Sequence, residues 1–87
     1  MLSQTIMIQN PHGLHARPAG ELVKIATSCD SDITLIVGER RINAKSIFSI
    51  MSAGIKCGTQ IEIECSGETE KEDLDCLLKA IEQGLGE

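Results

Sequence analysis

Aromatic side chains are almost absent from this sequence of 87 residues. Phe48 is the one phenylalanine, and the chain contains neither tryptophan nor tyrosine. Modules that bind single-stranded nucleic acid stack bases on aromatic rings, so this class of protein is nearly excluded. The formal net charge of −5 supports the same conclusion because a phosphate backbone repels an acidic chain. We therefore expect no nucleic-acid partner.

Long hydrophobic runs are also missing. No apolar stretch approaches the roughly 20 residues that span a bilayer, and no basic segment precedes a hydrophobic one near Met1. These absences predict a cytoplasmic protein without membrane insertion. The length of 87 residues predicts one small domain that covers residues 1–87.

The four cysteines show neither a metal-binding nor a disulfide pattern. Cys29, Cys57, Cys65 and Cys76 are widely spaced, and no histidine lies at ligand spacing from a cysteine pair. Disulfides are not expected in a chain without a secretion signal. We expect no metal and no cofactor, and we predict that Cys65 and Cys76 are small core residues.

Charge is distributed unevenly along the chain. Residues 62–87 contain nine acidic and two basic side chains, whereas residues 1–61 contain four acidic and six basic ones. Anions and acidic partners are attracted to positive surfaces. The sequence therefore predicts that a site for such a ligand lies in the first two thirds of the chain.

The hydrophobic period predicts the fold. Alternation predicts strands at residues 2–8, 33–37, 40–44 and 60–66, with Leu2, Ile6 and Ile8 of the first strand facing inward. Helical spacing predicts helices that begin near residues 15–17, at 46 and near 69. Thr69 and Glu72 fit a capping box for the last helix, which we expect to end at Gly84 or Gly86.

This order, β-α-β-β-α-β-α, indicates the α+β class. We expect a two-layer open-faced β-sandwich, in which three helices cover one face of a four-stranded antiparallel sheet. The charged alternate positions of the strand at 60–66 predict that the other face meets water.

The segment Gly-Leu-His-Ala-Arg-Pro-Ala at residues 13–19 exceeds what folding requires. It follows a predicted turn at 10–13, in which we interpret His12 as a turn residue, and it places His15 at a helix start. The unpaired amides of a helix start bind phosphate or carboxylate, Arg17 adds fixed donors, and His15 adds a nucleophile. The residues alone leave open that His15 and Arg17 serve only capping and surface solvation.

A second segment, Lys-Ser-Ile-Phe-Ser-Ile-Met at residues 45–51, is too apolar for a short surface helix. Its apolar residues and Ile55 cover more than half of the circumference, so some of them must remain exposed. Such a cluster is typical of a docking surface. Ser46, the expected N-cap, would place an added phosphate beside it, although the residues alone leave open that Ser46 is only a cap.

These two segments closely resemble the HPr family of phosphocarrier proteins in the bacterial phosphoenolpyruvate:sugar phosphotransferase system, and the resemblance covers the whole chain. It implies that His15 accepts a phosphoryl group at Nδ1 from phosphorylated enzyme I and passes it to the IIA domains of sugar permeases. It places the phosphate near Ala16 and Arg17. It also implies a carrier with a phosphohistidine intermediate rather than a turnover enzyme.

The same resemblance assigns roles to the second segment. It makes Ile47, Phe48 and Met51 part of the partner-docking surface, next to the first helix. It makes Ser46 similar to a regulatory site that HPr kinase/phosphorylase phosphorylates, after which the carrier binds a catabolite control regulator. Two alternatives remain open, namely a nitrogen-branch homologue with the same histidine motif and a regulatory binding module that acts through Ser46 alone.

Overall fold

The structure, a computed structural model, describes residues 1–86. Its elements follow in the order β1 (Leu2–Met7), α1 (Ala16–Ser28), β2 (Asp32–Val37), β3 (Arg40–Asn43), α2 (Ile47–Ser52), β4 (Gln60–Ser66) and α3 (Glu70–Glu82). The predicted α+β class and element order are confirmed. No helix in the described part of the chain has the length and apolar composition needed to cross a membrane.

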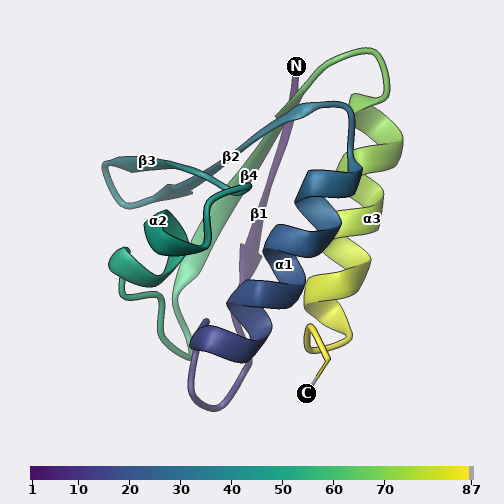
Figure 1. Cartoon of the computed structure of the whole chain (residues 1–87). Helices are drawn as coiled ribbons and strands as arrows, with labels where there is room; N and C mark the ends of the chain where they lie inside the picture. The colour runs from purple at the N-terminus through teal and green to yellow at the C-terminus, as the bar shows by residue number, and fades with distance from the viewer. Residues whose placement is uncertain (87) are drawn as a thin grey trace.

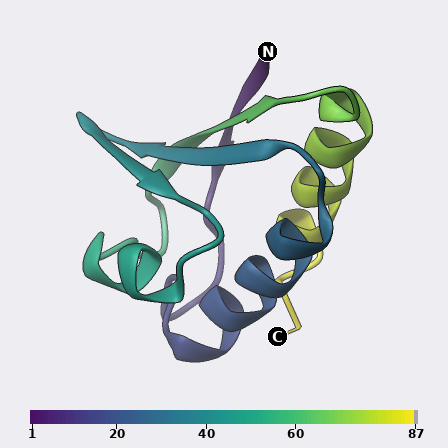
Figure 2. The ribbon, with the colours of Figure 1, turned by 45° about the horizontal axis from the view of Figure 1, so that its top comes forward.

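The sheet forms one layer of the molecule and the helices form the other (Figure 2). Its strand order is β1-β4-β2-β3, and every neighbouring pair is antiparallel. On the helical side, α1 and α3 lie side by side, while α2 lies near β3 (Figure 1). The interior strands are β4, which pairs with β1 and β2, and β2, which pairs with β4 and β3; the alternate residues Ile61, Ile63 and Cys65 of β4 are all buried.

The core lies between these layers. Ile61 and Ile63 of β4 and Leu35 of β2 point inward, and Leu22 of α1 and Leu77 of α3 meet them from the helical side. Each is at most 1% exposed. Burying a side chain of this size stabilises the fold by roughly 1.5–3 kcal/mol. The 3.6-residue spacing on the helices and the two-residue spacing on the strands therefore produce a common apolar interface.

Two predictions of burial are wrong. Leu2 is 39% exposed because it lies at the end of an edge strand, with a paired strand on one side only. Cys76 is also exposed, since the inward stripe of α3 passes through Leu74 and Leu77 instead. The second buried thiol is Cys29, which follows the end of α1.

The predicted capping box of α3 is wrong as well. The Thr69 side chain makes no capping hydrogen bond, and its hydroxyl donates to Asp73 at 2.8 Å instead of meeting the first amides of the helix. The last helical residue is Glu82, and Gly84, which follows the C-cap Gln83 with a φ of 89°, ends the helix as predicted. Leu85 nevertheless belongs to the core, because the chain turns back there with a positive φ of 50°.

Candidate functional site

The start of α1 carries the predicted histidine motif. His15 is the N-cap residue, in an extended conformation, and its carbonyl accepts the first helical hydrogen bond from Ala19 at 3.0 Å. Within residues 1–86 no side chain caps this helix, and its first turn contains no acidic residue. The amides of Ala16 and Arg17 belong to the turn whose N–H groups have no intrahelical acceptor, while Pro18 has no N–H at all.

Exposure makes this helix start accessible. Ala16 and Arg17 are exposed and His15 is half-buried. The permanent charge of the Arg17 guanidinium adds to the positive end of the helix dipole. The start of α1 therefore carries His15, the amides of Ala16 and Arg17 and the Arg17 side chain at consecutive positions of the chain.

The loop before His15 is locked against the segment that follows α2. Gly13 has a φ of +67°, and a Cβ placed on it would lie 2.2 Å from the carbonyl oxygen of Ile55 and 2.6 Å from the Cα of Lys56. The amide of Leu14 donates to the same Ile55 carbonyl at 3.0 Å. Only glycine fits this approach, so Gly13 fixes the position from which His15 leaves the loop.

A second anchor joins the loop to the end of α3. The side-chain Nδ2 of Asn10, a buried residue, donates to the carbonyl of Gly84 at 2.9 Å. The amide of Gly13 donates to the Asn10 carbonyl at 2.9 Å, which confirms the predicted turn. Sequence reasoning missed the anchoring role of Asn10, because its partner is 74 positions away and no local pattern connects the two.

His12 is closer to the site than its sequence context suggested. It lies in the turn, as predicted, and is exposed. Its ring and that of His15 have centroids 6.0 Å apart and planes at 75°, an edge-to-face arrangement. The short spacing between His12 and His15 in the sequence could have indicated that their rings lie close together. We considered His12 only as a turn residue or a metal ligand and therefore did not predict this proximity.

The short helix α2 presents an exposed apolar surface, as the composition of its segment predicted. Ile47, Phe48 and Met51 are 43%, 80% and 47% exposed, and we call these three residues the α2 patch. Ile50 and Ile55 face inward and are at most 5% exposed. The helix therefore divides its apolar residues between the core and the solvent.

The α2 patch adjoins α1. A methyl group placed on Gly20 would lie 3.9 Å from Cδ1 of Ile47, and Gly20 is five positions after His15. Ser46 lies at the start of α2, where its Oγ accepts a hydrogen bond from the amide of Ser49 at 3.3 Å. The predicted N-cap is confirmed. The histidine, the patch and the serine thus lie on neighbouring parts of the surface.

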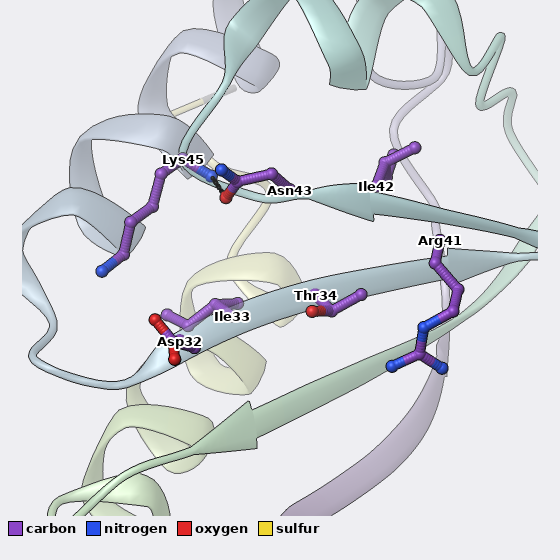
Figure 3. Close-up of a pocket in the computed structure, with 7 residues that line it drawn as sticks. All are labelled: Asp32, Ile33, Thr34, Arg41, Ile42, Asn43 and Lys45. Atoms are coloured by element: carbon purple, nitrogen blue, oxygen red, sulfur yellow. Dashed lines mark hydrogen bonds between the residues drawn. The ribbon is translucent and has the colours of Figure 1, made fainter.

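A hollow of about 370 Å³ between β2 and β3 lies elsewhere (Figure 3). Lys45, which lines it, donates from Nζ to the carbonyl of Cys29 at 3.2 Å, at the C-terminal end of α1. A helix of 13 residues is about 20 Å long, so this contact is far from His15. Lys45 neutralises the negative end of the helix and has a structural role.

The buried thiols do not compete for the chemistry of the site. Burial, with a smaller contribution from the Asp73 charge, raises the pKa of both Cys29 and Cys65 to about 11. Both are therefore protonated at neutral pH and poor nucleophiles. Within residues 1–86, no three histidine, cysteine, aspartate or glutamate side chains are grouped to hold a metal ion.

Comparison with known proteins identifies the class. A family model described as the PTS HPr component phosphorylation site matches residues 2–83. The phosphocarrier protein HPr of Mycoplasma capricolum subsp. capricolum is 41% identical over 85 residues, which cover 98% of this chain and 91% of the relative. The HPr of Buchnera aphidicola subsp. Acyrthosiphon pisum is 39% identical over 77 residues, with coverages of 88% and 91%.

A solved structure agrees with these matches. The crystal structure of HPr-C-His from Thermoanaerobacter tengcongensis has a TM-score of 0.95 and 39% identity, and the match covers 100% of this chain and 98% of that one. Fold and sequence together define a phosphocarrier of the phosphotransferase system. The chain belongs to the PTS HPr family, and the comparisons do not favour the nitrogen-branch and regulatory-module alternatives.

Proposed function

We propose that His15 is the residue that carries the phosphoryl group. The observation that supports this most directly is the start of α1, which no side chain of residues 1–86 caps and where His15 is the N-cap residue directly before Ala16 and Arg17. In a family of phosphocarriers, the phosphoryl acceptor needs a nucleophile beside an anion site, and this helix start combines the two. Arg17 then serves as the counter-charge for the bound phosphoryl oxygens.

The transfer is a displacement at phosphorus. A lone pair on the His15 ring, at Nδ1, forms the new N–P bond while the bond from phosphorus to the donor atom of phosphorylated enzyme I breaks. The electron pair of that bond stays on the donor, which takes the proton that the imidazole gives up. A IIA domain of a sugar permease then removes the phosphoryl group by the same chemistry. Since both half-steps need a partner, the chain is a carrier and not a turnover catalyst.

The α2 patch is the surface on which these partners dock. Exposed Ile, Phe and Met side chains on one short helix are typical of protein-binding surfaces, and the patch adjoins α1 through Ile47 and Gly20. A partner that covers the patch therefore lies close to the residue that gives or receives the phosphoryl group. Enzyme I and the IIA domains both act in the cytoplasm, which is the location that we propose for this chain.

Ser46 is a regulatory phosphorylation site, recognised by an HPr kinase/phosphorylase, and its phosphorylated form binds a catabolite control regulator. A phosphoserine there adds roughly −1.5 to −2 charges beside the α2 patch. The negative charge favours the N-cap but disfavours burial against an acidic partner. Ser46→Asp should therefore slow transfer from enzyme I without changing the circular dichroism spectrum, and equal transfer rates would remove this proposal.

The test of the carrier site is incubation with enzyme I and labelled phosphoenolpyruvate. We expect acid-labile, alkali-stable label on the wild-type chain, and a loss of about a thousandfold or more in His15→Ala. Arg17→Ala should slow labelling by roughly a hundredfold, as removal of one donor to a developing anion does.

Lys24→Ala is the matched control, because it removes one exposed positive charge from the same helix, more than one turn further on. Its labelling should equal that of the wild type. Acid-labile label that persists in folded His15→Ala would place the phosphoryl group on another residue. Label that is acid-stable would contradict a phosphohistidine.

A further inference from the structure

A second imidazole lies beside the proposed phosphoryl acceptor. The His12 and His15 ring centroids are 6.0 Å apart, with the planes at 75°. A phosphoryl group on a His15 ring nitrogen extends beyond the edge of that ring, into the surroundings that His12 shares. The two rings are therefore close enough for the ring N–H groups of His12 to act on phosphoryl oxygens directly or through one water.

Three neighbouring residues restrict the backbone at His12. Pro11 precedes it, and Gly13, which follows it, is buried against Ile55. Asn10 ties the start of the turn to Gly84 beyond α3. A side chain on such a turn projects from a fixed point, so the proximity of the two rings is built into the loop.

We propose that His12 is a positioning residue for the phosphoryl group on His15, which it attracts more strongly when its own ring is protonated. The proposal rests on the proposed function of His15. Histidine is the side chain that ordinarily changes charge between about pH 5 and pH 8, and a neutral ring attracts a phosphate dianion far less than a charged one. His12 therefore makes the stability of the phosphorylated carrier depend on pH within that range.

The other charged groups around His12 do not supply this dependence. Glu82, the last residue of α3, lines the same hollow of about 390 Å³ as His12, and a carboxylate there repels a phosphoryl group. Arg17 at the start of α1 and Lys56 in the loop after α2 remain positive throughout. Among these side-chain types, histidine is the one whose charge ordinarily changes near neutral pH.

Linkage gives a direct measurement of the effect. If a protonated His12 favours the phosphorylated carrier by some factor, phosphorylation must favour protonation of His12 by the same factor. A tenfold preference moves the titration midpoint of the His12 ring upward by about one pH unit. NMR resolves this midpoint, since the chain has only two histidines.

Phosphoramidate is the probe, because it phosphorylates imidazoles without enzyme I, and the measurement uses the purified species that carries the phosphoryl group on His15 alone. A ring nitrogen lone pair forms the N–P bond as the P–N bond of phosphoramidate breaks, and the departing ammonia takes the ring proton. We expect the His12 midpoint to rise by about one pH unit in the protein phosphorylated at His15. A midpoint that stays in place would overturn the inference and leave the proposed function intact. Failure of His15 to accept phosphate would overturn both.

Two variants separate charge from shape, and His12 is exposed enough to replace without loss of the fold. Near pH 5.5, phosphorylated His12→Gln should hydrolyse about threefold to tenfold faster than the wild type, and near pH 8 at the same rate. His12→Lys keeps its positive charge, so it should match the wild type near pH 5.5 and last longer near pH 8. Variant-to-wild-type ratios that are the same at both pH values would contradict the proposal.

Discussion

The two long helices of this molecule have the same length and opposite beginnings. Both α1 and α3 have 13 residues, and they lie side by side on the sheet (Figure 1). The first turn of α3 contains Glu70, Glu72 and Asp73, whereas that of α1 contains no acid and one base, Arg17. Negative side chains stabilise a helix start and positive ones oppose it.

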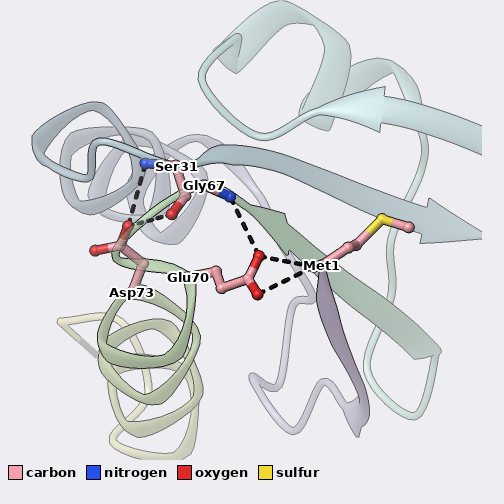
Figure 4. Close-up of polar contacts among 5 residues, drawn as sticks. All are labelled: Met1, Ser31, Gly67, Glu70 and Asp73. Atoms are coloured by element: carbon pink, nitrogen blue, oxygen red, sulfur yellow. Dashed lines mark hydrogen bonds and ion pairs between the residues drawn. The ribbon is translucent and has the colours of Figure 1, made fainter.

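The positive start of α3 is offset by the acids of its own first turn, and hydrogen bonds within the chain hold two of them in place (Figure 4). Glu70 accepts hydrogen bonds from the Met1 ammonium group at 3.0 Å and from the amide of Gly67 at 3.2 Å, and these lower its pKa. Asp73 accepts from the hydroxyl and the amide of Ser31 and from Thr69. All of these hydrogen bonds are made within the protein. The acids at the start of α3 therefore stabilise the fold.

The start of α1 lacks the stabilisation that acidic side chains give to the start of α3. No acid and no capping side chain offset its positive end in the described chain, and Arg17 adds to it. A helix start that is left positive at the surface stabilises an anion from outside. The comparison of the two helices indicates that the proposed anion site depends on two features of α1. One is the histidine at its start, and the other is the absence of acidic side chains from its first turn.

The largest expected effect comes from detaching the start of α1 from its support. Gly13→Ala forces a Cβ into the Ile55 carbonyl at a positive φ. We expect it to lower the free energy of unfolding by roughly 2–4 kcal/mol, measured by urea denaturation. Gly38→Ala is the control, since Gly38 has a similar φ of +62° but no atom within 4 Å of an added Cβ, and it should cost about 1 kcal/mol. Equal losses would show that contact with Ile55 does not matter.

The next effect comes from giving α1 the kind of start that α3 has. Ala16→Glu should raise the free energy of unfolding by about 0.5 kcal/mol, because its carboxylate meets the helix dipole. The same carboxylate occupies the anion site, so we expect phosphoryl transfer from enzyme I to slow by at least roughly tenfold. Thr27→Glu adds the same charge at an exposed position in the last turn of α1 and should leave transfer unchanged. Faster transfer in Ala16→Glu would contradict the comparison.

Removing an acid from α3 should have the smallest effect on phosphoryl transfer. Asp73→Asn weakens the contacts to Ser31 and Thr69 and should lower the free energy of unfolding by about 1 kcal/mol, with transfer unaffected. Asp75→Asn, at an exposed position of the same helix, is the control.

The pH dependence of stability gives the same residue a second test. The hydroxyl of Ser31, followed by that of Thr69, lowers the pKa of the Asp73 carboxyl in the folded chain. Its contribution is therefore complete above the ordinary pKa of about 3.9 and is lost as the pH falls through the lower, folded value. Unfolding free energies of wild type and Asp73→Asn should converge below that pH. A difference that persists unchanged in acid would contradict this role.

Local patterns in the sequence were sufficient to predict the elements and several local features of their surface. The alternation at residues 60–66, the apolar excess around Phe48 and the Ser46 cap all depend on near neighbours, and the structure has each of them. Pro18 and the apolar spacing after it likewise located the start of α1.

What remained unpredictable depends on contacts between distant parts of the chain. Asn10 meets Gly84, and Gly13 meets Ile55, because the fold brings three loops together at one end. The capping box failed for the same reason, since Asp73 is oriented by Ser31, 42 positions earlier. The strand order, which leaves Leu2 on an edge, follows from pairing that no short pattern specifies.

The most direct measurement is the change in backbone amide resonances when the protein is phosphorylated. The central claim is that the start of α1 binds the phosphoryl group, while the positive start of α3 is already offset by the acids of its first turn. We predict large ¹H–¹⁵N shifts for Ala16 and Arg17 and none for Glu70 and Lys71, the corresponding first two residues of α3. Unchanged Ala16 and Arg17 resonances in a protein that carries phosphohistidine would contradict the account.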